Sequence, residues 1–115
     1  MKTKKELWGL IEKADWKSDH NYKRIKTLFT KELSHEDFIQ LKEFVSTKRN
    51  ELAKKFEQDW LADPGIEVSD DGWWDLTAEV VGRGEKFYKG ITVKKLQKMA
   101  RTMDYHENFE YSFQS

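Results

Sequence analysis

The sequence predicts an all-α protein, a single compact domain of about five helices with a long central helix. Three observations favour this class. Apolar residues recur at helical spacing through most of the chain, a capping residue stands before most of these runs, and the only proline lies between two of them. With 115 residues, the chain has the size of one domain spanning 1–115, because two halves would each bury too little core.

The first helix is expected over residues 4–15. Thr3 and Glu6 have the spacing of a capping box, in which each side chain accepts a hydrogen bond from the backbone of the other residue. The apolar positions of the run then fall on one helical face: Leu7, Leu10, Ile11 and Ala14.

Two further helices are expected before the proline. The second carries an apolar face from Tyr22 to Leu33. The third begins after Ser34, a favourable capping residue, and its apolar positions continue for about six turns towards Trp60. This long run predicts the central helix of the domain.

The fourth helix is expected after the turn at Pro64-Gly65, which ends the third. Ser69 is its predicted cap, and the acids at Asp70 and Asp71 suit the positive end of a helix dipole. The glycines of 82–84 should break or bend this helix, since each costs about 1 kcal/mol within a helix.

The last helix is expected after Thr92, with a short turn around Phe87 and Tyr88 preceding it. The tail from Tyr105 to Ser115 alternates aromatic and polar residues. It fits either a short extended segment or an aromatic arm lying over the helices.

Composition excludes several classes of function. The chain has no cysteine, so disulfides, thiolate metal sites and cysteine catalysis are excluded. A formal net charge of zero argues against general nucleic-acid binding, which needs a basic excess. No apolar run approaches the roughly 20 residues of a membrane span, and no signal peptide is recognisable, so a cytoplasmic protein is expected.

The balanced charge hides a segregation along the chain. Residues 59–79 contain seven carboxylates and no Lys or Arg, whereas residues 83–101 contain seven basic residues and only Glu85 as an acid. Such patches either pair within the fold or attract a charged partner. Internal pairing is the more favoured interpretation, with Arg83 bound to an acid of the 59–79 segment. A nucleic-acid accessory role for the basic segment is the weakest alternative.

The 59–79 segment also holds three of the five tryptophans. Unopposed acids beside clustered indoles, without an evident catalytic group, are typical of a surface that binds a protein. We therefore expect a non-enzymatic interaction module of a regulatory or toxin-neutralising type, with no cofactor. Its predicted binding residues are Trp60, Ser69, Asp70, Asp71, Trp73, Trp74 and Arg83.

Two alternatives stay open for the acidic pair. Adjacent carboxylates could bind a metal ion or act as acid and base, which would make Asp70 and Asp71 the centre of an enzyme. They could instead only stabilise the start of their helix through the helix dipole. The histidines at 20, 35 and 106 are dispersed and offer no pair at the i, i+4 spacing of a zinc helix, so no metal site is predicted.

The order of these features resembles a bacterial family known as domain of unknown function 4240. The resemblance covers most of the chain, and its most specific element is the Ser69-Asp70-Asp71-Gly72-Trp73 box. Further matches are Leu7-Trp8 with Ile11, Trp60-Leu61-Ala62, Gly82-Arg83-Gly84 before Phe87, and the acidic aromatic stretch from Glu107 to Tyr111. The resemblance implies a mainly helical fold and no catalytic assignment.

Overall fold

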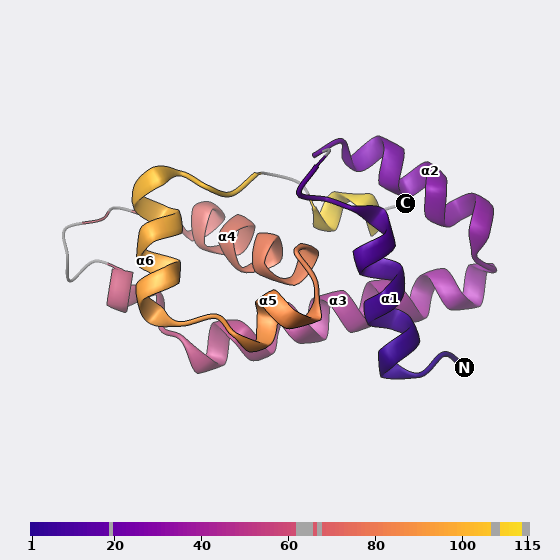
Figure 1. Ribbon diagram of the computed structural model, residues 1–115, viewed down its shortest axis with the longest axis horizontal. Coiled ribbons are helices and arrows are strands. Elements are labelled where there is room, and N and C mark those ends of the chain that lie inside the picture. The colour runs from indigo at the N-terminus through magenta and orange to yellow at the C-terminus, as the bar shows by residue number, and fades with distance from the viewer. Residues whose placement is uncertain (19, 62–65, 67, 107–108, 114–115) are drawn as a thin grey trace.

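The longest helix, α3 (His35–Lys55), runs along most of the molecule, and the other helices pack against it (Figure 1). The computed structural model describes residues 1–18, 20–61, 66, 68–106 and 109–113. Every regular element in these ranges is helical, which confirms the all-α prediction with its long central helix. The molecule is elongated, with extents of 44 × 24 × 21 Å.

The described elements are six α-helices and two 3-10 helices. None of these helices is both long and apolar enough to cross a membrane. Besides α3, they are α1 (Lys4–Ala14), α2 (Tyr22–Glu32), η1 (Gln58–Leu61), α4 (Asp70–Gly82), α5 (Glu85–Lys89), α6 (Val93–Thr102) and η2 (Glu110–Phe113).

The predicted caps are present. Thr3 and Glu6 form both bonds of the capping box before α1. Ser34, Ser69 and Thr92 each accept a backbone N–H of the first turn that follows them. Asn21 caps α2 in the same way, a role that the sequence interpretation did not assign.

Helix ends differ from the predictions in two places. The first helix ends at Ala14 because Asp15 adopts a left-handed conformation with φ of 52°. The third helix does not extend to Trp60, because Phe56 leaves the helix in an extended conformation and η1 follows as a separate element. Pro64 and Gly65, the predicted turn, lie outside the described residues.

The apolar side chains form two clusters along the molecule. The first joins α1, α2 and the first half of α3 with the C-terminal segment. The second joins the end of α3 with α6 and the segment before it. α4 contributes to both, through Ala78 and Val81 on the first and through Leu76 and Val80 on the second.

The C-terminal segment is an aromatic arm rather than an extended strand over its described residues 109–113. Phe109 and Phe113 are 1% and 2% exposed. Phe113 stacks on Phe29 of α2 with ring centroids 5.8 Å apart, and it lies the same distance from Phe38 of α3. The arm therefore completes the first cluster.

Candidate functional site

Ser69, one of the predicted binding residues, caps the start of α4. Its hydroxyl oxygen accepts a hydrogen bond from the backbone N–H of Gly72 at 3.0 Å. The hydroxyl thus satisfies one of the amides that a helix start leaves without a partner.

Asp70 and Asp71 occupy the first turn of α4, and both are exposed. Neither carboxylate forms an ion pair with a described residue. Their position suits the helix dipole, and their exposure leaves both accessible to a partner. Asp63 and Glu67, two further acids of the 59–79 segment, lie outside the described residues.

The neighbouring tryptophans point in different directions. Trp73 is half-buried and packs against the second apolar cluster. Trp74 is 46% exposed, and the guanidinium carbon of Arg49 lies 3.2 Å from its ring centroid. One indole therefore belongs to the packing of the domain, while the other lies at the surface against a buried arginine.

Trp60 is the second exposed indole of the predicted set, with 37% of its surface accessible. Its ring meets that of Phe56 edge-on at 6.2 Å, and its carbonyl accepts a hydrogen bond from Gln97 of α6. The structure thus places Trp60 beside the junction of α3 and α6.

Arg83 pairs with an acid of the 59–79 segment, as predicted from the charge segregation. Its Nε donates to Glu79 Oε2 at 2.8 Å, and its Nη2 donates to Asp104 Oδ1 at 2.9 Å. The Glu79 side chain is 0% exposed and that of Arg83 only 6%. This arginine is therefore committed to an internal ion pair rather than to the surface of the acidic segment.

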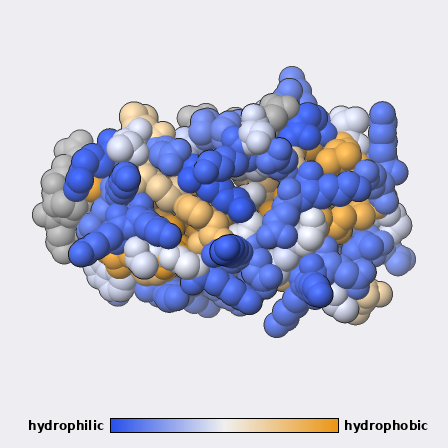
Figure 2. All heavy atoms as spheres, viewed as in Figure 1, coloured by the Kyte–Doolittle hydropathy of each residue, from blue (hydrophilic) through white to orange (hydrophobic). Residues whose placement is uncertain are grey.

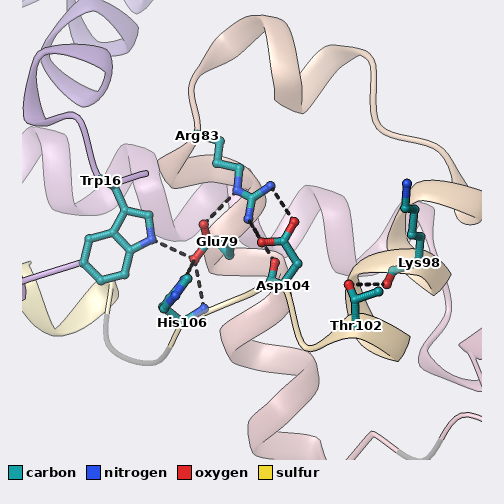
Figure 3. Close-up of polar contacts among 7 residues, drawn as sticks. All are labelled: Trp16, Glu79, Arg83, Lys98, Thr102, Asp104 and His106. Carbon is teal, nitrogen blue, oxygen red and sulfur yellow. Dashed lines mark hydrogen bonds and ion pairs between the residues drawn. The ribbon is translucent and has the colours of Figure 1, made fainter. Parts of the chain in front are cut away.

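Glu79 is the centre of a polar network that joins three parts of the chain (Figure 3). Its Oε1 accepts the indole N–H of Trp16 at 2.8 Å and the backbone N–H of His106 at 3.0 Å. The Nδ1 of His106 lies 3.4 Å from the same oxygen. A buried carboxylate costs much less when several donors surround it, which explains how Glu79 remains within the core.

Two imidazoles lie against this carboxylate. The rings of His20 and His106 stack with centroids 3.3 Å apart and an interplanar angle of 17°. His20 also meets Trp16 edge-on at 5.1 Å. The ligating atoms of His20, Glu79 and His106 all lie within 4.8 Å of one another, the group among the described residues that could hold a metal ion.

The charges of the network shift two pKa values. The Arg83 hydrogen bond lowers the pKa of the Asp104 carboxyl, more strongly than its slight burial raises it. Burial opposes the charge of Arg83, but the hydrogen bonds and charges of Asp104 and Glu79 outweigh it and raise the Arg83 pKa. Both groups therefore stay ionised around neutral pH.

The sequence interpretation missed Trp16, His20, Asp104 and His106. Trp16 and Glu79 are 63 positions apart, so no local spacing connects them. One signal was available: Glu79 stands between Ala78 and Val80 in a run where every residue from 76 to 82 is buried. An acid inside an apolar run of this kind requires partners.

Comparison with known proteins identifies a family. No curated protein and no solved structure matches the chain. A family model described as a protein of unknown function, DUF4240, matches residues 1–114, which is nearly the whole chain. The protein therefore belongs to the DUF4240 family, in agreement with the resemblance carried by the Ser69-Asp70-Asp71-Gly72-Trp73 box.

Proposed function

We propose that this protein is a non-enzymatic interaction module that binds a protein partner through its acidic tryptophan face. We define this face by Trp60, Asp70, Asp71 and Trp74. The partner would present basic side chains next to an apolar residue. In line with the bacterial family that the chain resembles, we propose a regulatory or toxin-neutralising role in the bacterial cytoplasm.

The observation that carries this proposal is the environment of Trp74. Its indole is 46% exposed, while Arg49, which lies against the ring, is only 7% exposed. A buried guanidinium therefore supports an indole that is nearly half exposed. A side chain that is held in place before binding loses less entropy on binding, and tryptophan is enriched among residues that dominate binding energy.

The carboxylates extend the face along α4. Asp70 and Asp71 precede Trp74 by four and three positions, the spacings that place side chains next to one another on a helix. Because both acids are exposed, they would attract a basic segment and accelerate its encounter with the indole.

Trp60 is the second exposed indole of the face. It lies in η1, the element that follows α3, and its ring contacts Phe56 at the end of α3. With Trp74, it gives the proposed surface two exposed indoles. The face of the molecule shown in Figure 2 is mostly hydrophilic.

An enzyme centred on Asp70 and Asp71 is the alternative. The ligating group that the described residues bring together lies instead at His20, Glu79 and His106. The described hollow between α1 and α3, of about 320 Å³, is lined by other residues, among them Leu7, Phe44 and Lys48. The exposed indole therefore favours interaction over catalysis at this pair.

The test compares surface variants as baits for partner capture, followed by titration of the purified partner. We expect a partner bound by the wild-type protein to bind at least tenfold more weakly to Trp74→Ser and to Asp71→Asn. The matched control is Glu36→Gln, which removes an exposed first-turn acid from α3 instead of α4. All variants should melt within a few degrees of the wild type, because these side chains lie at the surface.

The proposal fails if a purified partner binds all four proteins equally. It also fails if Trp74→Ser and Asp71→Asn both unfold the domain, because the face would then be structural.

A further inference from the structure

We infer that His20, Glu79 and His106 form a binding site for a divalent transition-metal ion of the zinc type. This site is independent of the acidic tryptophan face. It lies where the α1–α2 connection and the segment after α6 meet the last turns of α4. The three ligating atoms already lie within 4.8 Å of one another.

The ligand types select the metal. Two imidazole nitrogens and a carboxylate oxygen suit zinc, copper, nickel or iron, whereas magnesium and calcium prefer oxygen alone. Three protein ligands with a fourth position left to water are a common zinc arrangement. Tetrahedral ligands at zinc distances lie about 3.4 Å apart, so the present group, within 4.8 Å, needs to close by up to about 1.4 Å.

His20 and His106 lie in segments that allow the ligand atoms to move closer together. His20 and His106 belong to connecting segments rather than to helices, so small side-chain rotations can bring both nitrogens to one ion. The imidazoles stack with centroids 3.3 Å apart and nearly parallel planes, so one ring must turn for both in-plane nitrogens to face the same ion. The side chain of His106 is 44% exposed, which leaves it room to turn.

Glu79 is held in place by hydrogen bonds, as metal-bound carboxylates are. A carboxylate has about four acceptor positions. Three are taken by the Trp16 indole N–H, the His106 backbone N–H and the Arg83 Nε–H. The remaining acceptor position lies on Oε2, the oxygen that Arg83 also contacts, and the three donors fix the carboxylate in the way that outer hydrogen bonds fix metal ligands.

The charges around the site favour a cation. Glu79 and Asp104 carry two negative charges against the single positive charge of Arg83. Because Glu79 is 0% exposed, water screens its attraction for the ion only weakly.

The test is calorimetric titration of the full chain without an affinity tag, using zinc chloride and, separately, magnesium chloride. We expect one zinc ion per chain with micromolar or tighter affinity, and no saturable heat with magnesium. His20→Gln and His106→Gln should each weaken zinc binding at least tenfold. His35→Gln is the matched control, because it removes the third histidine of the chain from an exposed position on α3.

Cobalt(II) provides a second readout on the same proteins. Bound to two nitrogens and an oxygen in a tetrahedral or five-coordinate site, it should give a visible absorption that His35→Gln keeps and the other two variants lose. Absence of saturable zinc binding by the wild type would overturn the inference. Equal affinity in all three histidine variants would do the same, since binding would then lie elsewhere. These variants decide the question even if Glu79→Gln does not fold.

Discussion

The buried negative charge of Glu79 is neutralised by a residue nearby in the sequence. Its counterion, Arg83, lies one helical turn later and is itself shielded from water. Two N–H groups from distant segments donate hydrogen bonds to the other carboxylate oxygen, Oε1. Removing one member of such a pair leaves an uncompensated charge in the core, which usually costs about 3–5 kcal/mol.

We therefore predict that Arg83→Gln lowers the free energy of unfolding by about 3 kcal/mol, measured by urea denaturation. The control is Lys89→Gln, which breaks the i, i+4 pair with Glu85 on the surface, where the Lys89 side chain is 70% exposed. That change should cost less than about 0.5 kcal/mol. Equal losses in the two variants would mean that Glu79 does not depend on its arginine.

The contacts of individual residues were predictable only where both partners lie close together in the sequence. The pairing of Arg83 with an acid of the 59–79 segment followed from the charge segregation. The contacts of Glu79 with Trp16 and His106 did not, because they span 63 and 27 positions. Contacts at such separations depend on how helices pack, which no short spacing encodes.

Among the elements, α4 has a close approach to two aromatic rings at its last residue, Gly82. A Cβ atom at Gly82 would lie 3.0 Å from a ring carbon of Phe109 and 3.1 Å from one of Trp16. Both rings are buried, at 1% and 0% exposure, and have little room to move. This glycine thus allows the aromatic arm and the α1–α2 connection to approach the helix.

We predict opposite effects for two glycine-to-alanine changes. Gly82→Ala should destabilise the protein by about 1–3 kcal/mol, because the added methyl group overpacks the core. Gly9→Ala should stabilise it by about 0.5–1 kcal/mol, since Gly9 lies within α1 and its Cβ would have no neighbour within 4 Å. Thermal melts of both variants measure this. Stabilisation by Gly82→Ala would show that the rings can move aside.

Helix starts were predicted better than helix ends. A start is marked by one side chain that accepts an amide hydrogen bond, as at Thr3, Ser34, Ser69 and Thr92. The ends of α1 and α3 depend on backbone conformations at Asp15 and Phe56, two residue types that also occur readily within helices. Their conformations are set by the packing that follows.

At the scale of the whole molecule, Tyr88 connects the two apolar clusters. It packs against both, and its hydroxyl donates towards Lys48 O and the Glu51 carboxylate, each at 3.2 Å. Burial, followed by the negative charge of Glu51, raises the pKa of Tyr88 to about 12. The phenol is therefore held in its neutral form.

This shift predicts a loss of stability at high pH. Because the folded pKa lies above the unfolded value of about 10, the contribution of Tyr88 is complete below pH 10 and is lost as the pH rises towards 12. Tyr88→Phe should cost about 1 kcal/mol at neutral pH through its lost hydrogen bonds. The difference between the two proteins, from denaturation at several pH values, should shrink above pH 10. A constant difference up to pH 12 would contradict the assignment.

The class and the central helix were predictable because periodicity and capping act over a few residues. The division of the core into two clusters was not, since it depends on which face of α4 meets which neighbour. The position of the tail also stayed open, because aromatic alternation fits both an exposed strand and a buried arm.

The burial of Phe113 beside α2 has a consequence for biosynthesis. The chain leaves the ribosome amino terminus first, so α1 and α2 emerge long before Phe109 and Phe113, which pack against them. Until the aromatic arm arrives, the apolar faces of these helices stay exposed to solvent or to a chaperone. Native packing of this half is therefore expected to finish only after residue 113 has left the exit tunnel.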